Sequence, residues 1–282
     1  MMRFFSKSPR PGPVSEQKQE VRFTAADAAL ALEQRGPRLL EFVANCVEPQ
    51  ALGVEIGPFD RPLLTRPEWN VRYADVNTTD DLKYLAGRSP LRHVEKVVEV
   101  DYVLKSVSLP RAISGHGVKF VFGSHVYEHI PNLLGFLRDI ATELGRGGTV
   151  IGAFPDRRYT YDIDRPRTTL GQFLDRDARD ISQPDPQTVF DHFYHNREVK
   201  AGQIWTKGAD HGAPRRFSLG HAQEMMQQAQ TRYVDVHCNV LTDQEFVDLT
   251  EVFPELGINL GLHALVKTYR PLHEFHFCLK VL

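Results

Sequence analysis

A twelve-residue stretch, Ala51–Pro62, constrains the fold of this chain more than any other segment. Its apolar run over 52–56 predicts a short buried strand. Gly57-Pro58 ends that strand, because proline has no amide hydrogen for a strand ladder. A buried parallel strand that stops at a glycine turn places a ligand at the carboxyl edge of a doubly wound α/β sheet. The stretch lacks the G-x-G-x-x-G pattern, so it does not match a dinucleotide fingerprint.

An acid twenty residues past Glu55 supports this interpretation. Asp75 ends a second apolar run, 71–75, and this spacing is typical of an acceptor for ribose hydroxyls at the tip of strand two. Three more runs, at 94–100, 120–124 and 149–154, alternate with helical patterns. Strands and helices in this rhythm predict a parallel sheet with helices on both faces.

Other segments depart from the alternating rhythm. Residues 1–20 combine prolines with charges and predict a disordered tail. Two short helices should follow from Thr24 onward, before the first strand. Residues 156–240 are rich in Arg, Asp, His, aromatic residues and Pro, which indicates an insertion folded over the carboxyl ends of the strands. We expect helices within it at 168–180 and 219–229.

Regular pattern resumes at Thr242, which forms a capping box with Glu245 and starts a helix that runs to about Phe253. Two strands follow, near 260–268 and 274–282, and their short connection predicts an antiparallel ending. We therefore expect a single domain over 21–282. Its parts are a ligand-binding half at 48–155, the inserted lid at 156–240, and a C-terminal helix with antiparallel strands at 241–282.

Composition excludes some classes of function. The chain has 282 residues, 41% hydrophobic and 25% charged, with a formal net charge of -2. Such a balance gives no general drive toward nucleic acid. The sequence has no run of about 20 apolar residues that would span a bilayer, and no apolar segment of the signal-peptide type follows its first residues. Three widely spaced cysteines predict a reduced, cytoplasmic protein.

Five pieces in order resemble class I S-adenosylmethionine-dependent methyltransferases. They are Val54-Glu55-Ile56-Gly57, Tyr73-Ala74-Asp75, Val98-Glu99-Val100-Asp101, Ser124–Ile130 and Leu144-Gly145-Arg146-Gly147-Gly148. The fourth is similar to the S-x-V-x-E-H stretch after strand four of many such enzymes. The fifth is similar to their turn before strand five, with Arg146 in place of proline. Glu55–Pro62 and Phe154–Asp162 look like a bacterial subgroup found beside glycosyltransferases in surface-polysaccharide loci.

The resemblance implies a Rossmann-like methyltransferase sheet, mostly parallel with an antiparallel C-terminal strand, and S-adenosylmethionine as the cofactor. It implies that Asp75 binds the ribose, that Asp101 and Tyr102 bind the adenine, and that Glu55 orders the loop and the ammonium group. Glu55 as a helix cap and Asp101 as an exposed strand-end acid are the alternatives. The implied cofactor-binding set is Glu55, Gly57, Asp60, Arg61, Asp75, Asp101, Tyr102 and Ser124.

Methyl transfer to a hydroxyl needs a base, because the donor is already activated and the nucleophile must lose a proton. Histidine suits that task near neutral pH. His125 and His129 follow strand four, where a base would face the methyl group, and Glu128 lies between them as an orienting acid. These three form the expected catalytic set. A backbone hydrogen bond at a helix start is the alternative role of His129.

The expected acceptor-binding residues lie at the exit of strand five and in the insertion. They are Asp156, Arg157, Arg158, Tyr159, His192, His195 and His211. Arginines here suit an anionic acceptor, although ion pairs with neighbouring aspartates would explain them equally well. The acid–histidine pairs of the insertion can bind a divalent metal, act as base and orienter, or make only polar contacts. We assign no metal ligands from the sequence.

The sequence thus predicts a methyltransferase that acts on a hydroxyl of a glycan or another small polar acceptor, with no nucleic-acid partner and no transmembrane segment. The loci of the subgroup also imply an association with glycosyltransferase machinery. The alternative is a catalytically silent, methyltransferase-like module that binds or scaffolds in glycan assembly. A third alternative, an enzyme that uses NAD or a nucleotide sugar, is disfavoured by the missing glycine pattern.

Overall fold

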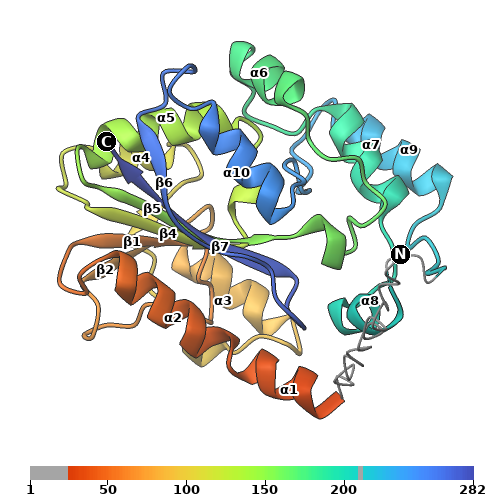
Figure 1. The fold of residues 1–282 in the computed structure, drawn as a ribbon, viewed down its shortest axis with the longest axis horizontal. Coiled ribbons are helices and arrows are strands. Elements are labelled where there is room, and N and C mark those ends of the chain that lie inside the picture. The colour runs from red at the N-terminus through yellow and green to blue at the C-terminus, as the bar shows by residue number, and fades with distance from the viewer. Residues whose placement is uncertain (1–24, 209–211) are drawn as a thin grey trace, which may run out of the picture.

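The protein folds around a single seven-stranded sheet (Figure 1). The structure is a computed structural model that describes residues 25–208 and 212–282, so the tail predicted at 1–20 lies outside the described residues. The strand order is β3-β2-β1-β4-β5-β7-β6. The strands are β1 (Gly53–Ile56), β2 (Val71–Asp75), β3 (Tyr102–Val103), β4 (Phe120–Ser124), β5 (Thr149–Pro155), β6 (Leu260–Val266) and β7 (Glu274–Val281).

β7 alone runs antiparallel to its neighbours, and the other described pairs are parallel. The predicted doubly wound sheet with an antiparallel C-terminal strand is therefore confirmed. The chain leaves β1 toward β2 on one side and later returns to β4 on the other side. The carboxyl ends of β1 and β4 thus border the crevice where ligands bind in such sheets.

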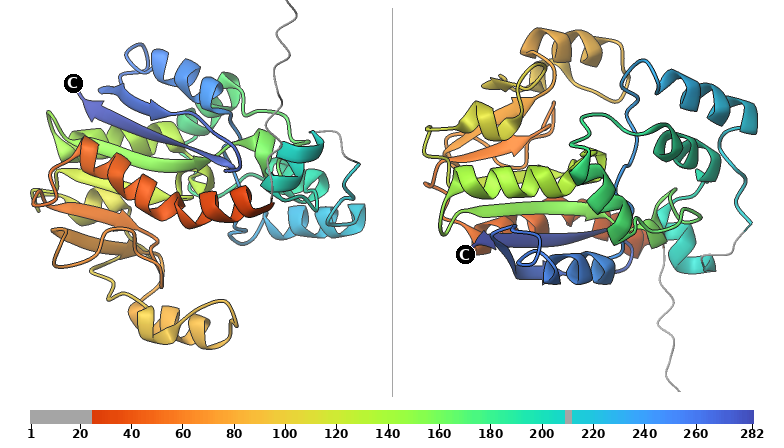
Figure 2. Two further views of the ribbon diagram at one scale, coloured as in Figure 1. Left: turned by 60° about the horizontal axis from the view of Figure 1, so that its bottom comes forward. Right: turned by 90° about the horizontal axis from the view of Figure 1, so that it is seen from above.

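Helices cover both faces of the sheet (Figures 1 and 2). Val54, Ile56 and Val121 belong to a core with α4 (Leu109–Ile113), α5 (Leu133–Leu144) and α10 (Asp243–Glu251). Phe120 and Phe122 point to the opposite face, where they pack with α2 (Arg35–Cys46). This division follows from the alternation of side chains along a strand. The remaining helices near the sheet are α1 (Ala25–Glu33) and α3 (Thr79–Gly87).

Helix starts agree with the capping signals of the sequence. The side chains of Thr78, Asn132 and Thr242 accept backbone amide hydrogens at the first turns of α3, α5 and α10. Such caps satisfy amides that have no partner within the helix. None of the described helices combines the length and the apolar character needed to cross a lipid bilayer.

The strand predicted at 94–100 is wrong. Residues Val94–Lys96 form a 3₁₀ helix, and β3 has only two residues. Asp101 explains the short pairing, because its carboxylate takes the backbone amide of Tyr73 at 2.8 Å and its own amide donates to the Tyr73 carbonyl. The Asp101 side chain thus takes a hydrogen bond from β2 that a longer β3 would otherwise accept through its backbone.

The insertion after β5 lies beyond the carboxyl ends of the strands (Figures 1 and 2). Its helices are η3 (Arg157–Tyr159), α6 (Leu170–Ala178), α7 (Pro186–His195), α8 (Ala201–Lys207) and α9 (Leu219–Gln228). α6 and α9 were predicted, whereas α7 and α8 were not. Pro186 occupies the first turn of α7, where proline loses no hydrogen bond, and Asp185 caps that turn.

Candidate functional site

The loops that follow β1 and β4 meet at the crevice. Gly57 has a φ of 65°, and a Cβ placed there would lie 3.8 Å from Cγ2 of Val126. The turn after β1 therefore needs glycine for its backbone conformation, while open space remains around it. This contact also places the turn directly beside the segment that holds the predicted catalytic histidines.

Glu55 points to the sheet face that the loop after β1 covers. Its side chain is buried, and its two oxygens accept the backbone amides of Leu63 and Leu64 at 2.8 and 2.9 Å. Burial raises the pKa of Glu55 to about 7, and the two amide bonds oppose that rise. The carboxylate thus orders the loop. Contact with an ammonium group of a ligand stays a prediction.

Asp60 and Arg61 tie the same loop to the segment near Arg92. Asp60 accepts from the guanidinium of Arg92 at 2.7 Å and from the amide of His93 at 2.9 Å. Arg61 donates to the carbonyl of Leu91 at 2.7 Å. These contacts are made within the chain, and cofactor binding by either residue remains a prediction.

Asp75 lies at the tip of β2, as predicted from its spacing. Its Oδ1 accepts from the backbone and side-chain amides of Asn77 at 2.8 and 3.2 Å, and burial raises its pKa. Asp101, in contrast, bonds to Tyr73 and to Arg66, and Tyr102 shares a hydrogen bond of 2.8 Å with His116. Ribose binding by Asp75 and adenine binding by Asp101 and Tyr102 stay predictions.

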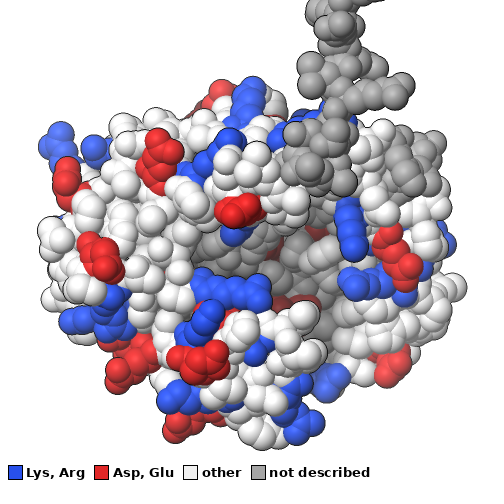
Figure 3. Space-filling view, turned by 90° about the horizontal axis from the view of Figure 1, so that it is seen from below, with Lys and Arg blue, Asp and Glu red and all other residues white. Residues whose placement is uncertain are grey.

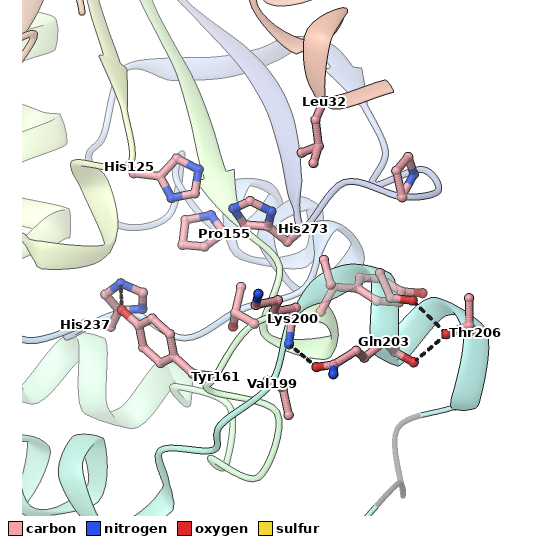
Figure 4. Close-up of a pocket in the computed structure, with 15 residues that line it drawn as sticks. Leu32, His125, Pro155, Tyr161, Val199, Lys200, Gln203, Thr206, His237 and His273 are labelled. Atoms are coloured by element: carbon pink, nitrogen blue, oxygen red, sulfur yellow. Dashed lines mark hydrogen bonds between the residues drawn. The ribbon is translucent and has the colours of Figure 1, made fainter. Parts of the chain in front are cut away.

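A cavity of about 640 Å³ lies between the carboxyl ends of β4 and β5 and the insertion (Figure 4). His125 and His273 lie near each other on its wall, and His237 lies beside Tyr161 (Figure 4). Of the residues predicted from the sequence, His125 and Tyr159 line this cavity. Further polar residues of the wall are Thr160, Tyr161, Lys200, Gln203, His237 and His273.

Helix α8 forms the roof of the cavity, and its Trp205 holds it against the carboxyl end of the sheet. Tyr159 and Trp205 stack with ring centroids 3.8 Å apart and planes within 11°. The indole of Trp205 also donates to the carbonyl of Leu272 at 2.9 Å, in the turn before β7. α8 is thereby docked over the carboxyl end of β5. From below, the molecular surface is hollowed near its centre, and charges of both signs border the opening (Figure 3).

His125 is held in a strained backbone conformation, with a φ of 56° that residues other than glycine rarely adopt. Its Nε2 lies 2.6 Å from Glu274, and its Nδ1 lies 3.5 Å from Glu128. Burial opposes charge on the ring, but these two carboxylates raise the pKa of His125 to about 9. His125 is therefore an imidazolium at neutral pH. Arg35 adds to this group by donating to both Ser124 and Glu274.

Glu128 is fully buried among imidazoles. Its Oε1 lies 3.7 Å from Nε2 of His129 and 3.9 Å from Nε2 of His237. Burial opposes ionisation, but the nearby charges of His125, His237 and His129 hold the pKa of Glu128 below its usual value. Glu128 thus remains a carboxylate. The other two catalytic candidates, His125 and His129, thus both lie close to Glu128.

Several residues of this region, His237 among them, were not assigned to the site from the sequence. Asp162 and Asp235 bond to His237 and His129, while Glu274 and His273 face His125. The antiparallel register of β5 with β7 sets Glu274 opposite Pro155. That register is known only once the strands are paired, so no pattern in the sequence pointed to Glu274 or His273.

The predicted acceptor-binding residues Asp156, Arg157 and Arg158 do not line the cavity. Asp156 is fully buried and accepts from Arg158 and from Thr268 at 2.8 Å. Arg157 pairs with Glu245. The arginines at the exit of strand five therefore make ion pairs within the chain, which was the alternative to binding an anionic acceptor. The same kind of ion pair joins Arg165 to Asp162 and Arg197 to Asp164.

The histidines of the insertion fall into different places. His192 is buried behind His237, whose backbone amide approaches its Nδ1 at 3.3 Å, and burial lowers the pKa of His192 to about 3. His195 ends α7 and is not among the cavity residues. His211 lies outside the described residues. Acceptor binding by these three histidines stays a prediction.

No protein-family model matches the chain, and no curated protein matches it. Solved structures with a similar arrangement include a protein of Rhodobacter sphaeroides assigned to Zn-dependent alcohol dehydrogenases, with 15% identity, a TM-score of 0.47, and coverage of 86% of this chain and 89% of that chain. The mitomycin 7-O-methyltransferase MmcR shows 11% identity and a TM-score of 0.41, and the match covers 89% of this chain but only 56% of that chain.

The methyltransferase CcbJ of Streptomyces caelestis shows 12% identity and a TM-score of 0.42, over 88% of this chain and 95% of that chain. Proteins with different reactions thus appear at similar scores, and none of these likenesses assigns an activity. The strand order and the direction of β7 establish the α/β fold of this chain without them.

Proposed function

We propose that this chain is an S-adenosylmethionine-dependent methyltransferase that methylates a hydroxyl of a polar acceptor, with a glycan as the favoured acceptor class. One observation carries the proposal. The turn after β1 opens directly beside the segment after β4, and that segment reaches the wall of a large cavity through His125. A donor site and an acceptor site would therefore share the crevice at the switch point of the sheet.

The residues at the β1–β2 edge fit the donor. Gly57 leaves space where a side chain would stand, and Asp75 presents a carboxylate at the tip of β2 for the two ribose hydroxyls. Glu55 contributes indirectly by fixing the loop at 63–64. When bound, S-adenosylmethionine supplies a methyl group on a sulfonium, which is already activated for displacement.

The cavity fits a polar acceptor of modest size. Its volume of about 640 Å³ lies within the usual range of small-molecule sites, and its wall combines aromatic rings with hydroxyl, amide and imidazole groups. Tyr159 and Tyr161 offer flat apolar surfaces, while Lys200 and Gln203 offer hydrogen bonds. Such a mixture suits a sugar ring. An association with glycosyltransferase machinery is the part of this proposal that rests on the resemblance alone.

Within the proposal, His273 takes the hydroxyl proton, because it lines the cavity beside His125 and its ring is uncharged. Burial and the charge of His125 lower the pKa of His273 to about 4, so its ring is neutral at pH 7 and able to accept. His125 is already charged and bonded to Glu274, which favours a role in orienting the acceptor. Within the proposal, catalysis is thus divided between two rings 5.4 Å apart.

The proposal is tested by binding and turnover in sequence. Calorimetry with S-adenosylmethionine and with its demethylated product should show a single site. Transfer of labelled methyl groups to glycan fractions should then occur, and His273→Gln should lower kcat while leaving donor affinity unchanged. Failure to bind either donor form would overturn the proposal. Donor binding without transfer to any acceptor would instead favour the silent binding module.

A further inference from the structure

Glu128 is an anomaly in the interior of this protein. Its side chain has no exposed surface, and neither carboxylate oxygen has a hydrogen-bond partner among the described residues. A buried carboxylate without partners is strongly unfavourable, so such a group calls for an explanation. The nearest polar atoms are ring nitrogens of His125, His129 and His237, at 3.5 to 3.9 Å from Oε1.

The three imidazoles are oriented in the same way. Each ring turns one nitrogen toward Glu128 and uses its other nitrogen on a second carboxylate. The outer contacts are His125 Nε2 to Glu274 at 2.6 Å, His129 Nδ1 to Asp235 at 2.9 Å and His237 Nδ1 to Asp162 at 2.5 Å. For His129 and His237, an outer carboxylate favours a proton on the nitrogen that it contacts and leaves the inner nitrogen as the one that could bind a metal, which is the arrangement around histidines that bind metals.

The distances fit a metal ion for three of these groups. Donor atoms of Glu128, His129 and His237 all lie within 4.8 Å of one another. With metal–ligand bonds of about 2.0–2.1 Å, a tetrahedral site has edges of about 3.3–3.4 Å. The observed separations of 3.7 and 3.9 Å from Oε1 exceed that edge by a few tenths of an ångström. Small side-chain rotations would close the site.

The backbone already holds these ligands together. The carbonyl of Glu128 accepts the amides of Cys238 and Asn239, and the Asn239 side chain donates to the carbonyls of Tyr127 and Ile130 at 2.8 Å each. Residues 110 positions apart in the chain are thereby clamped side by side. A site fixed in this way does not need to assemble when a ligand arrives.

From these observations we propose that Glu128, His129 and His237 bind a divalent transition-metal ion, with Asp235 and Asp162 as the supporting carboxylates. Two imidazoles and one carboxylate favour ions such as Zn²⁺, Co²⁺ or Fe²⁺ over Mg²⁺, which prefers oxygen ligands. Three protein ligands leave one position open. His237 lines the cavity, and the Tyr161 hydroxyl hydrogen-bonds the same His237 nitrogen at 2.6 Å, so an ion bound there would displace this hydroxyl or take it as the fourth ligand.

The site is tested by metal binding, which does not depend on methyl transfer. Protein freed of metal by chelation is titrated with ZnCl₂ in a calorimeter and with CoCl₂ under visible absorption. We expect one ion per chain, with cobalt bands of four- or five-coordination. Glu128→Gln and His129→Gln should each weaken binding by about 100-fold or more, and Asp162→Asn by about 10- to 100-fold. His129 is partly exposed, so its variant should fold even if the Glu128 variant does not.

Two control variants locate the ion. His263→Gln, an exposed histidine on β6, should leave the affinity unchanged. His273→Gln should do so as well, although His273 belongs to a neighbouring group with His125 and Glu274. Loss of binding in His273→Gln with retention in His129→Gln would overturn the assignment. Absence of binding to the native protein, or equal binding by native protein and His129→Gln, would overturn it too.

Discussion

Two regions along the carboxyl ends of the parallel strands hold buried acids, and the surroundings of those acids differ. At the β1–β2 end, Glu55 bonds two backbone amides and Asp60 bonds a guanidinium and an amide. At the β4–β5 end, Glu128 has three imidazoles nearby and no described hydrogen-bond partner. The difference indicates that satisfied acids hold a loop in shape, whereas an unsatisfied buried acid marks a place where something binds.

The variant with the largest expected effect tests whether the role of a buried acid depends on its hydrogen-bond partners or on its place in the sheet. Asp156 belongs to the β4–β5 end but is fully paired, with Arg158 and Thr268 as partners. Asp156→Ala removes several hydrogen bonds to a buried carboxylate, from Arg158 and Thr268, although Arg158 keeps its contact with Asp243. The free energy of unfolding should fall by about 3 kcal/mol, as measured by urea denaturation, because each hydrogen bond to a charged group contributes about 1.5–3 kcal/mol.

Asp248→Ala serves as the matched control for Asp156, because Asp248 is exposed on the nearby helix α10. Its effect should stay within about 0.5 kcal/mol. A normal stability in Asp156→Ala, combined with a raised KM for the acceptor, would assign Asp156 to acceptor binding instead and break the comparison.

The second prediction concerns the acid at the β1–β2 end that is offered to a ligand. Asp75→Ala should weaken S-adenosylmethionine binding by about 10- to 100-fold, because hydrogen bonds to a charged group contribute about 1.5–3 kcal/mol. Calorimetry measures the change. Asp80→Ala, an exposed acid in the first turn of α3, should leave the affinity nearly unchanged. Equal affinities for the Asp75 variant and the native protein would remove Asp75 from the donor site.

Much of the fold was predictable because the apolar runs and helix caps seen in the sequence agree with the packing of the folded chain. The strands at 71–75 and 120–124 have the predicted bounds, and Thr242 caps a helix as expected. Predictions failed where a side chain overrode the pattern. Asp101 shortened β3 by taking a ladder hydrogen bond.

The site was less predictable, for a different reason. Strand ends can be located from sequence, so His125, Glu128 and His129 could be grouped in advance. Their partners come from residues more than 100 positions away, such as Asp235 and Glu274. Sequence also cannot tell a paired arginine from a free one, which is why Arg157 and Arg158 were expected at the acceptor.

The third prediction asks whether Glu55 acts through its loop. Glu55→Gln replaces one acceptor by an amide donor that faces a backbone N–H, so one buried hydrogen bond is lost. The free energy of unfolding should fall by about 1–3 kcal/mol. Glu68→Gln, an exposed change in the following segment, is the control. If Glu55→Gln were fully stable yet bound the donor at least about tenfold more weakly, Glu55 would contact the donor directly.

The variant with the smallest expected effect tests how firmly helix α8 is held over the β4–β5 end. Tyr159→Leu keeps apolar bulk but removes the stack on Trp205, and an aromatic pair contributes about 0.5–1.5 kcal/mol beyond its buried area. Backbone amides of α8 should then exchange hydrogen about 2- to 12-fold faster, since 1.4 kcal/mol corresponds to a factor of ten.

Tyr194→Leu removes another stacked ring of the insertion, the one on Phe190, and should leave exchange in α8 unchanged. Equal acceleration in both variants would mean that the insertion opens as one unit. Acceleration confined to Tyr159→Leu would show that α8 moves separately over the β4–β5 end, giving acceptors access without disturbing the paired acids beneath it.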